Sequence, residues 1–299
     1  MDTPASHTAG TTTWSPPLPD APGFEHRMVD TPGLRTHVAT IGTGDPVLML
    51  HGFPQHWWQW RRIGPRLAGA GYRVICPDLR GSGWTEADEP GYRRETMLHD
   101  VVALLDGLGL PRVRVVSHDL GSVVAGQLSY AHPERVRSAV QLSVPPGFMI
   151  FTPRLLPAFR HMPRMLRHRE GASLRWVFGY PWVATPMTDE TLDGYLRVHS
   201  RSEVSRAVRA LYRGMVIPEV MRLSRGDYKR MRLHPPTLAA FGREDGPFRE
   251  EIVRRICRDA DRRADRFELA FVEGAAHFMT DDAPDEVAEL ILDWFRREG

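Results

Sequence analysis

The chain has 299 residues, of which 42% are hydrophobic and 25% are charged, and its formal net charge at pH 7 is +2. A chain of this length and composition forms one large domain, or one domain with an insertion, and can bury a substantial core. A net charge so close to zero gives no general attraction to nucleic acid or to a membrane surface. We therefore expect neither of these as a partner.

The two cysteines and the composition of the N-terminal residues bear on the cellular compartment of the protein. Cys76 lies in an apolar run and Cys257 in a charged helical pattern, so they predict neither a metal site nor a disulfide framework. A reducing cytoplasm is the simplest setting. Residues 1–23 are rich in Thr, Pro, Ala and Ser, lack the features of a signal peptide, and are predicted to form a disordered tail. No apolar run approaches the roughly 20 residues of a membrane-spanning helix.

Short apolar runs recur along the chain, a pattern typical of strands in a parallel sheet that is covered on both faces. These runs span residues 46–52, 72–78, 113–119, 138–144, 236–242 and 267–274. Helical patterns separate them, at residues 56–70, 93–109, 122–136, 248–261 and 283–298. The alternation predicts an α/β fold with a mostly parallel sheet and helices on both faces.

The alternation breaks in residues 146–235, which contain many prolines, several amphipathic helical stretches and no convincing strand. This segment is too long for a loop in a compact domain. We predict that it forms a helical cap, or lid, inserted into a core made of residues 24–145 and 236–299. The arginines on one face of the stretch 154–166 are interpreted as a solvated helix surface.

The stretch VVSHDLGSVVAG (115–126) predicts a strand, a tight turn and the start of a helix. Many hydrolases carry a serine nucleophile at the apex of such a turn, in the pattern G-x-S-x-G. Here the apex residue is Asp119. A lone Asp at the end of a strand is more often a helix cap, but the small neighbours and the following Gly121 favour a nucleophile.

Other short motifs follow the predicted strands in turn. They are HGFP (51–54) with WRR from Trp60, DLRGSGWTE (78–86), SHDLG (117–121), FGRED (241–245) and GAAHF (274–278). Each motif is weak alone, but together and in this order they resemble the epoxide hydrolase branch of the α/β-hydrolase superfamily. The resemblance covers residues 24–299. It implies the α/β-hydrolase fold with a helical cap, and hydrolysis without a cofactor or metal.

Asp119, Asp245 and His277 occur in the order nucleophile, acid, histidine that α/β-hydrolase triads show. Each follows a predicted strand, so the three should meet at the carboxyl edge of the sheet. An ionised Asp119 can attack an electrophilic carbon and form an alkyl ester with the enzyme. His277, oriented by Asp245, can then activate water to hydrolyse that ester. The backbone amides of Phe53 and Leu120 are expected to form the oxyanion hole.

The residues next to the nucleophile discriminate between substrates. An aspartate that attacked a carboxylic ester would form an anhydride, so epoxides or alkyl halides are favoured. Haloalkane dehalogenases usually bind the halide through a Trp directly after the nucleophile, and fluoroacetate dehalogenases place an Arg there. Here Leu120 follows the nucleophile and Phe53 follows His51-Gly52, and neither side chain can donate a hydrogen bond. An epoxide is therefore the favoured substrate.

Epoxide opening generates an alkoxide and needs a proton donor, which this family supplies as cap tyrosines. RALYRGM (209–215) resembles the second cap-tyrosine motif and makes Tyr212 the candidate donor, with an ordinary core tyrosine as the alternative. The usual upstream tyrosine is missing. Phe159 aligns with its place, and His161 and His168 stand nearby as possible donors.

The aromatic cluster HWWQW (56–60) and the cap predict a pocket for a small or medium apolar electrophile, with His161, Tyr180 and Trp182 as pocket residues. The favoured function is opening of an epoxide to a diol. Two alternatives stay open. One is an atypical dehalogenase or esterase-like hydrolase, and the other is a non-catalytic homologue that binds a ligand. The sequence leaves the oligomeric state open.

Overall fold

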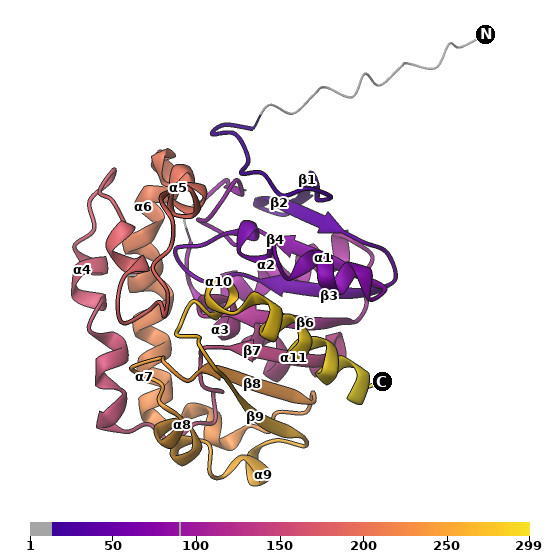
Figure 1. The fold of residues 1–299 in the computed structure, drawn as a ribbon, viewed down its shortest axis with the longest axis vertical. Coiled ribbons are helices and arrows are strands. Elements are labelled where there is room, and N and C mark those ends of the chain that lie inside the picture. Colours follow the sequence, from indigo (N-terminus) through magenta and orange to yellow (C-terminus); the bar gives the residue numbers. More distant parts are fainter. Residues whose placement is uncertain (1–13, 90) are drawn as a thin grey trace.

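The computed structural model describes residues 14–89 and 91–299, and a nine-stranded sheet forms its centre (Figure 1). The strands are β1 (Glu25–Thr31), β2 (Leu34–Ile41), β3 (Asp45–Leu50), β4 (Tyr72–Pro77), β5 (Glu86–Ala87), β6 (Val113–His118), β7 (Val136–Leu142), β8 (Thr237–Gly242) and β9 (Phe267–Val272). Their order is β1-β2-β4-β3-β6-β7-β8-β9, with β5 paired to β2. The strands from β4 to β9 in this order pair in parallel. The predicted α/β architecture is confirmed.

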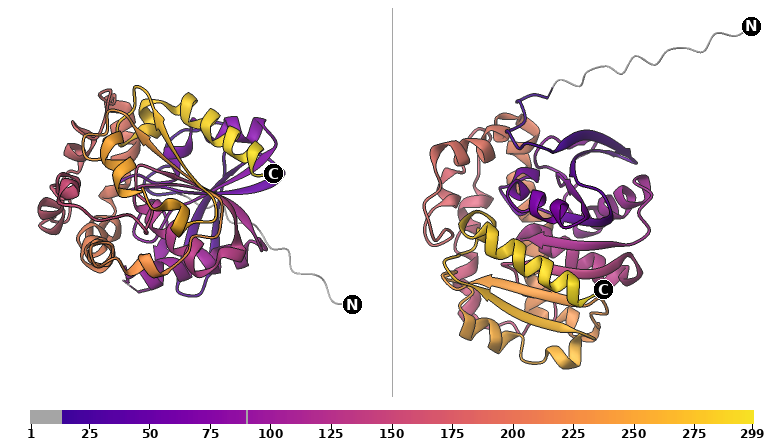
Figure 2. Two further views of the ribbon diagram at one scale, coloured as in Figure 1. Left: turned by 90° about the horizontal axis from the view of Figure 1, so that it is seen from below. Right: turned by 45° about the vertical axis from the view of Figure 1, so that its right-hand side comes forward.

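Helices cover both faces of the sheet (Figure 2). Those outside the segment between β7 and β8 are α1 (Gly64–Gly69), α2 (Arg94–Gly107), α3 (Leu120–Ala131), α8 (Glu250–Ile256), α9 (Ala260–Arg263), α10 (Met279–Asp282) and α11 (Pro284–Arg297). Helices α1 and α11 pack on one face, and α2 and α3 pack on the other. The predicted helix at 56–70 divides into a 3₁₀ turn (Trp57–Trp60) and α1, because Pro65 starts a new helix at its first turn.

The segment between β7 and β8 contains helices α4 (Met162–Leu166), α5 (Asp189–Leu196), α6 (Ser202–Leu211) and α7 (Ile217–Arg225), joined by 3₁₀ turns. It lies along one side of the sheet (Figure 1). All of residues 143–236 are described, and none belongs to a named strand. The helical nature of this segment agrees with expectation, whereas the boundaries of a cap at 146 and 235 stay a prediction.

The antiparallel pair β1 and β2 is not among the predicted strands. A two-residue turn, Pro32-Gly33, joins the two strands, and Gly33 has a φ of 74°. The side chains of β1 alternate in burial, which is typical of an edge strand with one solvated face. The Pro-Gly pair between alternating residues was the signal that could have predicted this hairpin.

The predicted disordered tail at 1–23 is wrong for residues 14–23. The indole nitrogen of Trp84 donates to the carbonyl of Pro16 at 2.7 Å, and that of Trp58 donates to the carbonyl of Asp20, also at 2.7 Å. Indole N–H groups that are buried need acceptors, and the N-terminal segment supplies them. Residues 1–13 lie outside the described residues.

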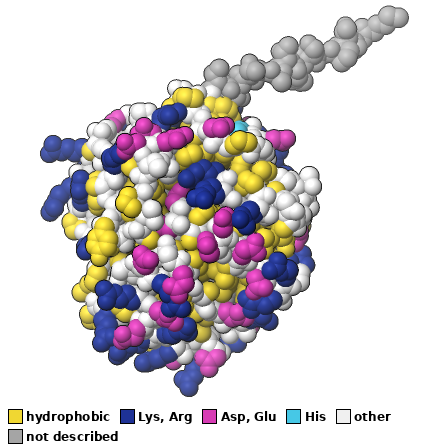
Figure 3. All heavy atoms as spheres, viewed as in Figure 1, with side chains coloured by type: hydrophobic (Ala, Val, Ile, Leu, Met, Phe, Trp, Pro, Cys, Tyr) yellow, Lys and Arg dark blue, Asp and Glu magenta, His cyan; other side chains and the backbone are white. Residues whose placement is uncertain are grey.

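Charge on one face and the length of the described helices bear on nucleic acid and membranes as partners. On the face shown in Figure 3, basic and acidic side chains are interspersed rather than gathered by sign. Among the residues that the structure describes, no helix is both long enough and apolar enough to cross a membrane.

Candidate active site

Asp119 sits at a sharp turn between β6 and α3. Its φ of 48° and ψ of −116° are unusual for a residue with a side chain, and such a conformation costs about 1–3 kcal/mol. The turn is compact because Gly121 has no side chain: a Cβ there would lie 2.3 Å from the carbonyl oxygen of Leu50. The predicted strand–turn–helix is therefore present, with the carboxylate at its apex.

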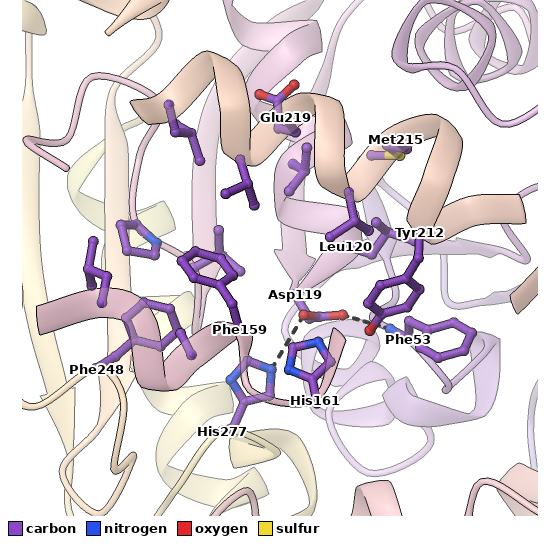
Figure 4. A pocket seen from close by; sticks show the side chains of 18 of the residues that line it. Phe53, Asp119, Leu120, Phe159, His161, Tyr212, Met215, Glu219, Phe248 and His277 are labelled. Carbon is purple, nitrogen blue, oxygen red and sulfur yellow. Dashed lines mark hydrogen bonds and ion pairs between the residues drawn. The ribbon is translucent and has the colours of Figure 1, made fainter. Parts of the chain in front are cut away.

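The three predicted catalytic side chains meet at the carboxyl edge of the sheet, and Figure 4 shows two of them, Asp119 and His277, side by side. The Nε2 atom of His277 lies 3.5 Å from Oδ2 of Asp119, and its Nδ1 atom lies 3.3 Å from Oδ2 of Asp245. Asp245 follows β8 and is fully buried, and His277 follows β9. The imidazole thus links the two carboxylates.

Two further residues hold the backbone of His277, and sequence reasoning did not identify them. Its carbonyl oxygen accepts a hydrogen bond from Oγ of Ser143 and another from Nε2 of His118, both at 2.8 Å. Burial lowers the pKa of His118 to about 4, so this ring is neutral and holds its proton on Nε2. Ser143 has a φ of 62°, which no sequence pattern revealed.

The loop after β3 brings one of the two predicted oxyanion donors to the carboxylate of Asp119. The amide of Phe53 donates to Oδ1 of Asp119 at 2.8 Å. Gln59 fixes this loop, because its Oε1 accepts from the amide of Gly52 at 2.9 Å. Leu120 is the first residue of α3, where amides have no partner within the helix. Its role in the oxyanion hole stays a prediction.

A cavity of about 140 Å³ opens beside Asp119 and His277. Its other walls are mostly apolar, and they include Phe53, Val123, Met149, Phe159, Trp182, Met215 and Phe248. His161 and Trp182 line it as predicted. Tyr180 does not, because its side chain is 91% exposed. Tyr180 lies in a turn, where residues two apart have no fixed common side. Its closeness to Trp182 in the sequence therefore did not place its side chain in the cavity. His168 also lies outside this lining, with its Nε2 3.4 Å from Oγ of Ser205.

Comparison with known proteins gives consistent results. Residues 45–167 match the family model described as the alpha/beta hydrolase fold. Epoxide hydrolase 3 of Siraitia grosvenorii is 42% identical, although that match covers 40% of this chain and 39% of the relative. Epoxide hydrolase 1 of the same plant is 28% identical over 92% of this chain and 99% of its own. The crystal structure of an epoxide hydrolase from Vigna radiata matches with a TM-score of 0.73 and 27% identity, covering 92% of this chain and 98% of that one. The chain has the α/β-hydrolase fold, and it is similar to epoxide hydrolases over 92% of its length.

The two carboxylates set the charge state of His277. Burial alone lowers the pKa of His277, but its hydrogen bonds and charge interactions with Asp119 and Asp245 outweigh burial and raise the pKa to about 10. Burial likewise disfavours ionisation of Asp119, but the hydrogen bond and charge of His277 hold the pKa of this carboxyl well below its usual range. At neutral pH the protein therefore holds an ionised Asp119 beside a protonated His277.

Tyr212 faces the nucleophile from the opposite wall of the cavity. It opens a π-helical turn (Tyr212–Val216), an irregularity that is frequent at functional sites. Its ring lies 5.7 Å from the ring of Phe53 and 5.6 Å from that of His161, and its hydroxyl points toward Asp119 (Figure 4). Burial, and then the charge of Asp119, raise the pKa of Tyr212 well above 10. The hydroxyl therefore keeps its proton.

His161 lies beside Asp119 and Tyr212 in the same view (Figure 4). Its Nδ1 atom is buried and has no hydrogen-bond partner among the described residues. Burial lowers the pKa of His161, so the ring is neutral at pH 7 and carries one N–H. The described residues contain no cluster of three His, Cys, Asp or Glu side chains that could hold a metal ion.

Proposed function

We propose that this hydrolase opens epoxides to diols through an alkyl ester on Asp119. The observation that carries the proposal is the placement of three groups around one apolar cavity. The carboxylate of Asp119 lies at the sharp turn between β6 and α3, which we call the elbow. His277 lies 3.5 Å from this carboxylate, and the Tyr212 hydroxyl points toward it. The epoxide hydrolases among the similar proteins support the same substrate class.

In the first step, an oxygen of Asp119 attacks one carbon of the three-membered ring. A carbon–oxygen bond forms, the ring bond at that carbon breaks, and its electron pair goes to the epoxide oxygen. Tyr212 donates its proton to this oxygen as the charge develops. The Tyr212 hydroxyl suits this role because burial keeps it protonated at neutral pH.

His161 is the second donor in this proposal. The family usually carries a tyrosine in this part of the cap, and here the position aligned with it holds Phe159. The His161 ring is 5.6 Å from that of Tyr212 and lines the same cavity. Its N–H can form a hydrogen bond to the opening oxygen while Tyr212 transfers the proton. His168 is not proposed, because it does not line the cavity.

In the second step, His277 acts as a base toward water. Esterification removes the charge of Asp119, which is one of the two carboxylates that raise the pKa of His277. The imidazole then releases its proton more readily to solvent, from which the Tyr212 phenolate takes one back, and the neutral ring can accept a proton from a water molecule. The resulting hydroxide attacks the carbonyl carbon of the ester. The amides of Phe53 and Leu120 hold the oxyanion. The bond between the acyl carbon of Asp119 and the substrate oxygen then cleaves, the departing oxygen takes the proton that His277 holds, and the diol is released. The new carboxyl proton passes to His277, which restores the ionised Asp119 beside a protonated His277.

The proposal also includes the remaining expectations from the sequence, on the cap, the cellular compartment and the kind of substrate. Residues 146–235 form the cap that carries Tyr212 and His161 over the core. The protein works in a reducing cytoplasm on a small or medium apolar epoxide. The buried state of both cysteines supports such a compartment, since neither Cys76 nor Cys257 forms a disulfide.

A single turnover in water enriched in heavy oxygen tests the covalent route. With enzyme in excess over a terminal alkyl epoxide, the first diol should carry no label, because its new oxygen comes from Asp119. The label should instead appear in the peptide that contains Asp119. Label in the first diol would show direct attack by water. A matched alkyl bromide should react far more slowly, because Phe53 and Leu120 present no side-chain donor to a halide.

A further inference from the structure

A second cavity of about 30 Å³ adjoins the active-site pocket. Five residues line both cavities, and they are Val123, Val144, Pro145, Glu219 and Leu223. Glu219 lies on the far side of the pocket from His277, with its carboxyl group directed away from Asp119 (Figure 4). The small cavity therefore continues the pocket beyond its apolar section.

The small cavity has polar walls with unused hydrogen-bonding capacity. Gln127 is only 1% exposed, yet neither its amide oxygen nor its amide nitrogen has a partner among the described residues. Glu219 is 5% exposed, and its Oε1 accepts from the hydroxyl of Tyr228. In the part of the chain that the structure describes, its Oε2 has no hydrogen-bond donor, although Nε of Arg94 lies 3.9 Å away.

These unmatched groups indicate that a polar occupant belongs in the cavity. A buried donor or acceptor left without a partner costs about 1–3 kcal/mol, and native proteins satisfy such groups with water or a ligand. One water needs a cavity of about 10–15 Å³, so this space admits a small polar group. Its chemistry is set by Gln127, which donates and accepts, and by Glu219, whose free oxygen accepts.

Helix α3 leads from the nucleophile to this cavity. Val123 and Gln127 follow Asp119 at intervals of four residues, so all three lie on one face of the helix. Eight residues of helix span about 12 Å. An extended chain of about ten bonds covers that length. The apolar section between the two ends suits a hydrocarbon chain.

We propose that the small cavity is a subsite for the polar end of the substrate, a hydroxyl or a primary amide on a chain of about ten bonds from the epoxide. Oε2 of Glu219 accepts the O–H or N–H of this group, and the amide of Gln127 completes its hydrogen bonds. A carboxylate at the same place meets the carboxyl group of Glu219 and is rejected. The proposal rests on the proposed function, since the epoxide must react at Asp119.

Three terminal epoxides of about ten carbons test the subsite. Their far ends are a methyl, a hydroxyl and a carboxylate group. We expect the highest kcat/KM for the hydroxyl-ended compound and the lowest for the carboxylate. Gln127→Leu should lower the ratio of kcat/KM between the hydroxyl-ended and methyl-ended compounds by about 2- to 12-fold, the worth of one hydrogen bond. The change should fall mainly on KM.

Gly126→Ala keeps the experiment decisive if Gln127→Leu folds poorly. A Cβ on Gly126 would lie 3.6 Å from Nε2 of Gln141, an ordinary contact that narrows the cavity. Ala also favours a helix over Gly. This variant should lower the same ratio. Gly107→Ala is the matched control, because its Cβ meets only side-chain atoms of β1 at 3.7 Å. It should leave the ratio unchanged.

Binding of a straight-chain primary amide of about ten carbons gives a readout that needs no turnover. Calorimetry should show several-fold weaker binding to Gln127→Leu than to the wild type. Equal binding, or equal substrate ratios in wild type, Gln127→Leu and Gly126→Ala, would overturn the subsite and leave the cavity to structural water. Failure of the proposed function has a different signature, namely no diol from the methyl-ended epoxide.

Discussion

At the scale of single residues, the proposed mechanism assigns the transfer of a proton to the epoxide oxygen to Tyr212. Tyr212→Phe keeps the ring and its packing against Phe53 and His161 but removes the donor. General acid catalysis is typically worth about 10²- to 10⁴-fold, so alkylation of Asp119 should slow by such a factor. Rapid-quench measurement with enzyme in excess reports this step directly. Hydrolysis of a preformed ester should change little.

Tyr180→Phe is the control for that experiment, since it removes a hydroxyl from a tyrosine of the same segment that is 91% exposed. It should alkylate at the wild-type rate. His161→Phe should slow alkylation by a smaller factor than Tyr212→Phe, because it removes a hydrogen bond rather than the proton. If His161→Phe had the larger effect, the two roles would have to be exchanged.

The charge state of His277 gives a second prediction at this scale. Asp119→Asn mimics the loss of charge on esterification and removes one of the two carboxylates that raise the pKa of His277. The pKa should fall from about 10 toward the ordinary 6.5, as an NMR titration of the imidazole would show. Glu244→Gln, at an exposed neighbour of Asp245, should leave it near 10. A pKa still near 10 in Asp119→Asn would contradict the proposal that esterification of Asp119 allows His277 to act as a base.

At the scale of elements, the elbow depends on the close approach of α3 to the end of β3. In Gly121→Ala the new Cβ would lie 2.3 Å from the carbonyl oxygen of Leu50. Overpacking of this kind typically costs about 1–3 kcal/mol, so urea unfolding should show a loss of stability of that size. Gly107→Ala, whose contacts lie at 3.7 Å, should lose none. Equal stability of the two variants would show that the elbow relaxes freely.

The parallel strands were the most predictable elements, because buried parallel strands appear in the sequence as continuous apolar runs. The triad was predictable for the same reason, since each member directly follows such a strand. The N-terminal segment was not, because what orders it is hydrogen bonding to Trp58 and Trp84, which lie far away in the sequence. Likewise, Ser143 holds the carbonyl of His277 across two strand ends, and no local pattern predicts that contact.

Side-chain direction in the segment between β7 and β8 was the least predictable feature. The residues around Tyr180 form short turns without a lasting helical period, so the sequence could not separate the exposed Tyr180 from the pocket residue Trp182. His161 was identified as a candidate only through its nearness to a missing tyrosine. What distinguishes it from His168 is burial against Tyr212, which depends on tertiary packing.

At the scale of the whole molecule, the active site contributes to stability in a pH-dependent way. Protonated His277 is stabilised in the folded state, where its pKa is about 10 instead of 6.5. Its contribution is therefore complete below pH 6.5 and is lost as the pH rises toward 10. The difference in unfolding free energy between wild type and His277→Gln should shrink over that range. A difference that grows with pH would contradict the ion pair.

The covalent ester on Asp119 is the central claim, and intact-protein mass spectrometry of His277→Gln tests it most directly. This variant keeps the nucleophile and the Tyr212 donor but lacks the base that hydrolyses the ester. After exposure to a terminal alkyl epoxide, it should gain the mass of one epoxide, located on the peptide that contains Asp119, and the double variant with Asp119→Asn should gain none. An unmodified His277→Gln, together with diol formation by Asp119→Ala within tenfold of wild type, would contradict the account.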